Sequence, residues 1–357
     1  MATQPLPMKR IPKRVMLHPG HTRLDDAPIP AAQREALKKL GFISVEQVLS
    51  ASKVVKSKLD NYLKTDVRQM FASVPQPVIP QLPMKAQIAE YRFGVRLERP
   101  VTAVMPRLDL AGAQYTPLTR TAPAPSAGPL GSTPDVNLIS EMPPVRDQGN
   151  RGTCVAHAAV AAMEHYLTRA GAIDLSEQFL YWNCKNHDGR PQSPGTLLAV
   201  AMPLLFTDGC CLETVWPYNP NPVPGNEGQG PPPAPAAADA ATRKAPAANQ
   251  LSPQSVSAIK NGLAAGRCVA VSVVVYDYCW TTPEIRSSGS VTMPFPGDTS
   301  NEGHAICLVG YDDSKQLFTF RNSWGDSWGD AGYGYLPYAY VLDPNLASDF
   351  WVILAES

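Results

Sequence analysis

The chain has 357 residues, room for one large or two modest domains, and 44% of them are hydrophobic, which excludes a protein that is disordered throughout. No run of 18 apolar residues occurs, so we expect no transmembrane segment. The 31 basic and 31 acidic side chains cancel overall, but residues 1–70 carry 13 Lys and Arg against 6 Asp and Glu. This asymmetry predicts two units with different roles.

The first residues are basic, and neither the apolar segment nor the cleavage pattern of a secretory signal follows them. We therefore expect a cytoplasmic protein, with export by a signal-less route as the alternative. In a reducing compartment the seven cysteines should be mostly thiols. They form no CxxC pair, so we expect no zinc site, no other metal and no cofactor.

The beginning of the chain is predicted to hold a tail and a small module. Residues 1–28 are polar, basic and proline-containing, which is typical of a flexible tail. Residues 29–75 have helical periodicity. One helix should end at Gly41, and a second should begin after Ser44, with Gln47 completing a capping box.

The turn between these two helices, residues 40–44, faintly resembles the helix-hairpin-helix modules that bind DNA through backbone amides. It lacks a second hairpin glycine, which argues against that use. The basic segment 1–70 also has the charge to meet a nucleic acid or a membrane surface. A solvated tail on a helical module is the better interpretation, so we expect no nucleic-acid partner.

Proline is unusually frequent, with 37 residues, of which 13 lie in residues 71–147 and 10 in residues 217–253. Residues 76–134 are therefore expected to form an extended linker, with one or two short strands within residues 91–104. Residues 219–250 are of low complexity and contain few large apolar side chains. They are expected to form a mobile insertion.

From residue 135 onward the sequence is typical of a globular α+β domain, with helices first and strands second. Apolar periodicity predicts helices over residues 153–170, 197–206 and 255–265. Pro203 weakens the second of these helices. Runs rich in β-branched and aromatic residues predict strands over residues 269–276, 305–311, 317–321 and 349–354.

Cys154 stands at the start of the helix predicted over residues 153–170. The unpaired N–H groups and partial positive charge of a helix N-terminus stabilise a thiolate and lower the pKa of a thiol. A cysteine needs such help to act as a nucleophile at neutral pH. A lone cysteine is more often a small buried apolar residue, so the assignment depends on its context.

That context contains three polar residues. Gln148 lies on the loop that leads to Cys154, where its amide can donate to an oxyanion beside the sulfur. His304 enters one predicted strand, and Asn322 follows the next one along the chain. Adjacent strands could set the two side by side, so that the Asn322 amide oxygen fixes the tautomer of the imidazole. Either residue taken singly would more often be a satisfied polar group at a strand end.

These residues lie in blocks that together resemble the papain-like cysteine peptidases over about residues 135–357. The blocks are Asp147-Gln148-Gly149 with Gly152-Thr153-Cys154, Leu175–Leu180, Trp216-Pro217-Tyr218, Gly303-His304-Ala305, and Asn322-Ser323-Trp324-Gly325. Their order and spacing argue against a chance match.

The resemblance implies a two-lobed fold, in which a helical lobe carries Cys154 and a β-barrel-like lobe carries His304 and Asn322. The cleft between the lobes would bind an extended polypeptide. Carried over by position, Cys154 is the nucleophile, His304 the general acid and base, Asn322 the group that orients it, and Gln148 an oxyanion donor. The substrate-binding residues implied in the same way are Gly195, Thr196, Gly303 and Trp324.

The sequence departs from the family pattern at several places. Arg151 stands where the family usually has a cysteine that forms a disulfide within the helical lobe, and Val155 replaces an aromatic residue. The usual helical propeptide pattern is not visible in residues 1–134. These departures leave the four chemical residues in place.

The leading hypothesis is therefore a monomeric cysteine endopeptidase of bacterial type that acts on polypeptides through a thioester acyl-enzyme. A further hypothesis is that residues 76–134 cross the cleft and gate it, because a proline-rich tether directly precedes the catalytic domain. Two alternatives remain open, namely transfer of the acyl group to an acceptor other than water, and a vestigial peptidase fold that serves as an interaction module.

Overall fold

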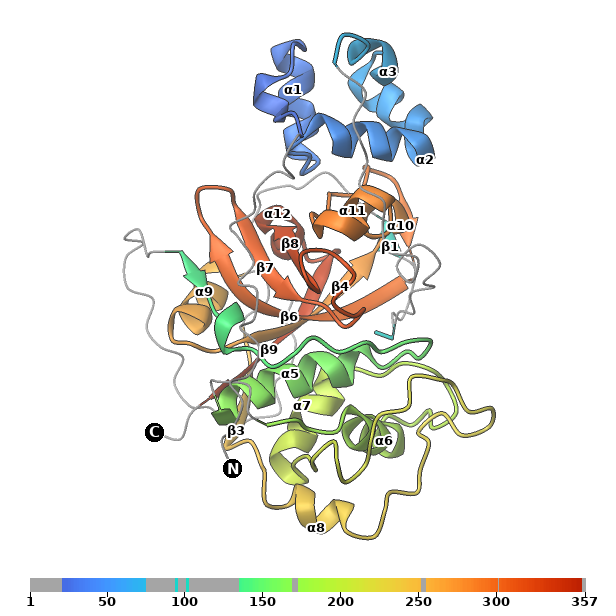
Figure 1. Ribbon diagram of the computed structural model, residues 1–357, viewed down its shortest axis with the longest axis vertical. Coiled ribbons are helices and arrows are strands. Elements are labelled where there is room, and N and C mark those ends of the chain that lie inside the picture. The colour runs from blue at the N-terminus through green and yellow to red at the C-terminus, as the bar shows by residue number, and fades with distance from the viewer. Residues whose placement is uncertain are drawn as a thin grey trace, which may run out of the picture.

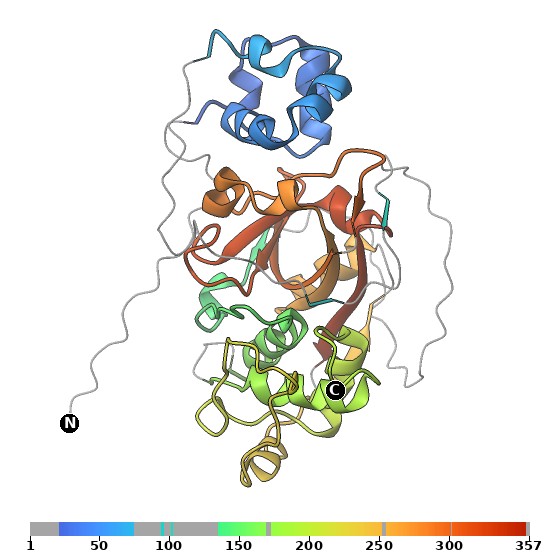
Figure 2. The same ribbon diagram turned by 90° about the vertical axis from the view of Figure 1, so that its right-hand side faces the viewer.

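A computed structural model describes residues 21–74, 94–95, 101–102, 135–168, 173–251, 255–300 and 302–354. Figure 1 shows three parts stacked along the long axis: the N-terminal helices α1–α3 at the top, a twisted sheet in the middle, and helices α5–α8 below. Figure 2 shows the same order from the side. Most of the predicted 76–134 linker lies outside the described residues.

The N-terminal module consists of α1 (Ala31–Lys39), α2 (Val45–Leu63) and α3 (Val67–Met70). The predicted capping box is confirmed, since Ser44 Oγ accepts the Gln47 N–H at 3.2 Å and Gln47 Oε1 accepts the Ser44 N–H at 3.3 Å. The module begins earlier than expected. Leu24 is buried and its N–H donates to the Ile43 carbonyl at 2.9 Å, so residues 21–28 pack as part of the module, and the prediction of a flexible tail is wrong for them.

The module packs on the end of the sheet, next to α10 (Asp277–Trp280) and α11 (Pro283–Ser288). The N–H of Met293 donates to the Leu40 carbonyl at 2.8 Å. Lys58 pairs with Asp298 at 2.7 Å. The rings of Tyr62 and Phe295 meet edge to face, 5.9 Å apart. Apolar, ionic and backbone contacts therefore join the module to the sheet lobe.

One antiparallel sheet forms the middle of the molecule. Its strands are β2 (Val136–Asn137), β3 (Ala247–Gln250), β4 (Val269–Val275), β6 (Glu302–Asp312), β7 (Leu317–Arg321), β8 (Tyr333–Pro337) and β9 (Ala347–Leu354). They run in the order β3-β9-β4-β6-β7-β8, and β2 pairs with β6. The four predicted strands are confirmed as β4, β6, β7 and β9. A separate pair joins β1 (Val101–Thr102) to β5 (Thr299–Ser300).

The lower part of the molecule in Figure 1 contains α5 (Cys154–Thr168), α6 (Glu177–His187), α7 (Leu198–Thr207) and α8 (Ala236–Ala240). The predicted helices are confirmed as α5, α7 and α9 (Val256–Ala264), and Pro203 lies inside α7. A short helix α12 (Tyr338–Leu342) follows β8, and the 3-10 turns are η1 (Leu24–Asp26) and η2 (Ile139–Glu141). The domain is thus α+β, with a helical lobe and a sheet lobe, as expected.

The prediction of a mobile insertion over residues 219–250 is wrong. Ala236 and Ala240 are fully buried, and residues 247–250 form the edge strand β3 against β9. The Gly228 carbonyl accepts a hydrogen bond from the Gln178 amide at 2.8 Å. Small alanines can fill narrow spaces, and buried donors on α6 satisfy the backbone, so a sequence with few large apolar residues packs here. Among the described residues, no helix is long and apolar enough to span a membrane.

Candidate active site

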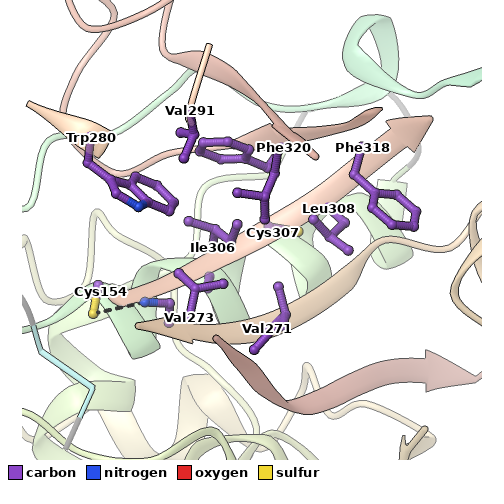
Figure 3. Packing of buried hydrophobic residues seen from close by; sticks show 14 of the residues in the cluster. Cys154, Val271, Val273, Trp280, Val291, Ile306, Cys307, Leu308, Phe318 and Phe320 are labelled. Atoms are coloured by element: carbon purple, nitrogen blue, oxygen red, sulfur yellow. Dashed lines mark hydrogen bonds between the residues drawn. The ribbon is translucent and has the colours of Figure 1, made fainter. Parts of the chain in front are cut away.

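Cys154 is the first residue of α5 and lies where the helical lobe meets β6. Its side chain is fully buried, and the backbone N–H of Ala305 on β6 donates to Sγ at 3.4 Å (Figure 3). Figure 3 shows the sulfur at the end of a sheet face filled by apolar side chains, with Val273 of β4 beside it. The helix start and the adjacent strand thus bring the predicted nucleophile next to the residue that follows His304.

His304 and Asn322 are brought together as predicted. His304 lies on β6, and Asn322 directly follows β7, the neighbouring strand. His304 Nε2 lies 2.8 Å from Asn322 Oδ1, and the same oxygen accepts the Ser323 N–H at 2.8 Å. An amide oxygen can only accept, so His304 carries its proton on Nε2. This tautomer leaves Nδ1 able to take a proton from a thiol.

Two indole rings enclose the imidazole. Trp324 stacks on His304 with ring centroids 4.6 Å apart and planes 25° apart. Trp280 of α10 meets the same imidazole edge to face at 6.0 Å. Trp324 is expected from its sequence motif, whereas Trp280 is not, because nothing in the DYCW segment distinguishes a site residue from a core residue. Together the two rings keep water from the hydrogen bond between His304 and Asn322.

Gln148 lies on the loop before α5 and is buried. Its Oε1 accepts the Ser323 hydroxyl at 2.6 Å, its Nε2 donates to the Arg151 carbonyl at 2.8 Å, and its backbone N–H donates to the Ser323 carbonyl at 2.8 Å. These bonds fix the orientation of the side-chain amide. An NH2 group carries a second N–H, which is the donor needed for an oxyanion.

Burial favours the neutral forms of both reacting side chains. It raises the pKa of Cys154 to about 11, against smaller opposite effects of the Ala305 and Gly94 backbone amides. It lowers the pKa of His304 to about 4, although the Asn322 hydrogen bond acts the other way. Burial of this site therefore disfavours the charged form of each group.

The predicted substrate-binding residues face a segment of the chain itself. The Thr196 N–H donates to the Gly94 carbonyl at 2.9 Å, and the Val95 N–H donates to the Gly303 carbonyl at 2.9 Å. Val95 pairs in parallel with Thr196 and antiparallel with Gly303. A Cβ built on Gly195 would meet the Gly94 carbonyl oxygen at 2.5 Å. Residues 94–95 thus lie between the two lobes, beside Cys154.

The strand-like segment at Gly195 depends on two residues that the sequence analysis did not identify. The ammonium of Lys185 is buried, pairs with Asp188 at 2.7 Å and donates to the Gly195 carbonyl at 2.9 Å. The Tyr181 hydroxyl accepts the Gly195 N–H at 3.0 Å. Their spacing of four residues along α6 places both on one helix face. It is a weak signal, since many helices carry a Tyr and a Lys four residues apart.

All seven cysteines are buried thiols. Within the described ranges, no group of three or more His, Cys, Asp or Glu side chains is arranged to hold a metal ion. At the position of the missing disulfide cysteine, the Arg151 guanidinium donates to Gln178 Oε1 at 2.7 Å and to the carbonyls of Asn219 and Glu227 at 2.9 and 3.0 Å. Hydrogen bonds rather than a covalent bond therefore join this loop to α6 and to the 219–230 segment.

Comparisons with known proteins agree with this geometry. The chain is 29% identical over 217 residues to an uncharacterized peptidase C1-like protein of Acanthamoeba polyphaga mimivirus, which covers 58% of this chain and 68% of that protein. It is 28% identical over 201 residues to cysteine proteinase 1 of Entamoeba histolytica, which covers 54% of this chain and 59% of that protein. The chain thus spans about three fifths to two thirds of the length of these relatives.

Among solved structures, xylellain, a cysteine protease from Xylella fastidiosa, matches with a TM-score of 0.59 and 27% identity over 76% of this chain and 100% of its own. The digestive procathepsin L 3 of Tenebrio molitor larval midgut matches with a TM-score of 0.52 and 17% identity over 91% of this chain and 100% of its own, which shows a shared fold. The family model for papain family cysteine proteases matches residues 134–341. The chain therefore belongs to the papain family of cysteine proteases, and its enzyme class is that of a cysteine-type peptidase.

Proposed function

We propose that the protein is an endopeptidase that cleaves polypeptides through Cys154, His304, Asn322 and Gln148. The observation that carries this proposal is the bond of His304 Nε2 to Asn322 Oδ1 at 2.8 Å, next to a strand residue whose N–H reaches Cys154 Sγ. It supports an imidazole held by Asn322 through Nε2 on the strand that contacts the thiol. Nucleophile, base and orienting group then form one unit.

The chemistry follows from these positions. Nδ1 of His304 takes the proton of Cys154 Sγ, and the thiolate attacks the peptide carbonyl carbon. The Gln148 amide and the Cys154 backbone N–H donate to the oxyanion of the tetrahedral intermediate. The C–N bond breaks as His304 protonates the leaving amine, which leaves a thioester on Cys154. His304 then takes a proton from water, and the hydroxide attacks the thioester carbonyl. The C–S bond breaks, which releases the carboxylic acid product and returns Cys154 to the thiolate form.

The proposal is tested with a fluorogenic peptide library and the Cys154→Ala variant. Loss of the nucleophile should lower kcat by several orders of magnitude. Peptidase activity in Cys154→Ala equal to that of the wild type would refute the assignment of Cys154 as the nucleophile. Added amines in the same assay distinguish hydrolysis from acyl transfer, because a transferase would form amide products instead of acids.

We propose further that the chain is latent while Gly94 and Val95 occupy the cleft. Two backbone hydrogen bonds tie them to Thr196 and Gly303, which are the residues expected to hold the backbone of a substrate. The Gly94 amide also lowers the pKa of Cys154, as a donor to the sulfur does, so this segment reaches the nucleophile itself. Such a segment blocks the cleft.

The electrostatics of the pair support latency. A covered cleft removes water from Cys154 and His304, and this desolvation favours the neutral thiol and imidazole. Departure of residues 94–95 would readmit water and lower the cost of the charged pair. Opening the cleft would therefore expose the site and also activate its nucleophile.

A further inference from the structure

Arg151 is the residue beside the candidate active site whose role the mechanism above leaves open. Its side chain is 2% exposed, although a guanidinium remains charged in proteins. Burying a charge is costly unless hydrogen bonds or other charges compensate it. Hydrogen-bond acceptors and aromatic rings surround the Arg151 guanidinium and compensate its charge. A side chain with so many specific contacts has a defined role in the structure.

The guanidinium joins its own loop to two other parts of the helical lobe. It donates to Gln178 on α6, and to the carbonyls of Asn219 and Glu227 in the 219–230 segment. It also lies over the rings of Tyr181 and Tyr218, with 5.2 Å to each ring centroid, a distance at which a cation is attracted to an aromatic face.

The side chain of Arg151 contacts α6 and the 219–230 segment, whereas its backbone carbonyl contacts Gln148, the candidate oxyanion donor. Its carbonyl accepts the Gln148 Nε2–H at 2.8 Å, and this bond sets the direction of the second N–H of that amide. The Tyr218 hydroxyl donates to the Gln148 carbonyl at 2.9 Å and lies 2.6 Å from the Thr153 hydroxyl. The loop that precedes Cys154 is thus held at Gln148 and at Thr153 by Tyr218, whose ring contacts the Arg151 guanidinium.

We propose that Arg151 is a positioning residue for the oxyanion donor Gln148, and that residues 219–230 are the anchor through which it acts. This inference rests on the proposed function of Gln148. The side chain fixes the loop against α6 and the 219–230 segment, and the carbonyl of the same residue holds the Gln148 amide. A lysine cannot replace it, because an ammonium lacks the planar fork that reaches three acceptors between two rings.

The test uses the full-length chain in a background that turns over peptide, either the wild type or Gly94→Val. It compares Arg151→Ala, Arg151→Lys, Gln148→Ala and the double variant Arg151→Ala/Gln148→Ala. The matched control is Arg243→Ala, which removes an arginine of the 219–250 segment that pairs with Asp239 at the surface. Two rates are measured: turnover of a peptide amide, and alkylation of Cys154 by iodoacetamide, a reaction that forms no oxyanion.

We expect Arg151→Ala to lower kcat by about 100-fold, as displacement or loss of an oxyanion donor does, with little change in KM. Alkylation of Cys154 should stay within about twofold, since the loss of a donor that acts on the oxyanion leaves the thiol untouched. The double variant should be no slower than Gln148→Ala, because both changes remove the same interaction. If Arg151→Ala does not fold, Arg151→Lys keeps the charge and carries the same expectations.

Multiplicative effects in the double variant, or alkylation that falls together with turnover, would overturn the proposal and leave Arg151 as a general structural support. Normal turnover in Arg151→Lys would overturn the requirement for a guanidinium. A Gln148→Ala variant with normal kcat would instead refute the oxyanion role of Gln148. That outcome is distinguishable, because it does not depend on any change at Arg151.

Discussion

The N–H of Val95 donates to the carbonyl of Gly303 over 2.9 Å, so a residue that precedes the peptidase domain is paired with the residue next to His304. The strand pair β1 and β5 continues this contact on the sheet lobe. The candidate active site is therefore covered by the chain's own backbone. This relationship makes the proposed latency open to direct tests in the full-length chain.

Replacement of Gly94 by valine should activate the full-length protein. A Cβ built on Gly94 would collide with the carbonyl of Gly152, so the segment could not stay in the cleft. Loss of the two hydrogen bonds at about 1 kcal/mol each corresponds to roughly a 30-fold shift toward the open state. We expect kcat/KM for a peptide to rise by about that factor. The control is Gly262→Val on α9, where a Cβ would make an ordinary contact with Val269 at 3.5 Å.

Equal kcat/KM values for the wild type, Gly94→Val and Gly262→Val would refute latency. Loss of activity in Gly94→Val, with thermal unfolding unchanged, would do the same and would give Gly94 a direct part in the active state.

The pH dependence of the reaction of Cys154 with iodoacetamide should show whether residues 94–95 cover the cleft. Burial raises the pKa of this thiol to about 11, so in the wild type the alkylation rate should keep rising up to about that pH. In Gly94→Val, water in the cleft should lower the pKa of Cys154. The midpoint of the alkylation rate plotted against pH should therefore lie at a lower pH than in the wild type. The measurement is the rate of modification at Cys154 by mass spectrometry across the pH range. Identical midpoints in the two proteins would contradict the effect of the cover.

Asn322→Ala should lower kcat by about 100-fold in an active full-length background. The imidazole loses the acceptor that fixes Nε2 as the protonated nitrogen, and its orientation toward Cys154 becomes less defined. The pH profile of kcat/KM should also change, because the hydrogen bond to Asn322 raises the pKa of His304. Asn345→Ala, an exposed residue of the sheet lobe, is the control. An unaltered kcat and pH profile would remove Asn322 from the mechanism.

Glu284→Gln should make the stability of the protein less dependent on pH. Glu284 on α11 is 1% exposed, and burial, with a smaller contribution from the neighbouring Glu46, raises its pKa from 4.5 to about 8. A raised carboxyl pKa means that stability is fully present below about pH 4.5 and declines as pH rises toward 8, by about 1.4 kcal/mol per pH unit. The glutamine amide of Glu284→Gln does not ionise, so the variant does not lose stability in this way as the pH rises.

Thermal unfolding is the readout for this prediction. We expect Glu284→Gln to have a higher Tm than the wild type at pH 8, and the difference to shrink or reverse at pH 4. Glu35→Gln on the exposed face of α1 serves as the control and should change neither value appreciably. A Tm difference that is the same at both pH values would mean that Glu284 is already ionised in the folded protein.

Much of the local structure could be predicted from the sequence. The helix α5, the four strands β4, β6, β7 and β9, and the capping box at Ser44 follow from periodicity and from residue preferences that act over a few positions. The strand β8 and the edge strand β3 were missed. β8 (YGYLP) contains a glycine and ends in a proline, and β3 lies inside a stretch with many prolines. β8 depends on pairing with β7, and β3 on pairing with β9, about 100 residues further along the chain, and no local pattern encodes this pairing.

The sequence by itself identified the family and predicted the four chemical residues, because the order and spacing of short motifs can be recognised without knowledge of the fold. Only the tertiary structure decided what surrounds them. Trp280 contacts the imidazole, Arg151 anchors the Gln148 loop, and Gly94 and Val95 fill the cleft. Trp280 and the 94–95 segment are far along the chain from the residues that they contact. The contacts of the 94–95 segment are backbone hydrogen bonds. Backbone groups are the same at every position, so their pairing leaves almost no signal in the sequence.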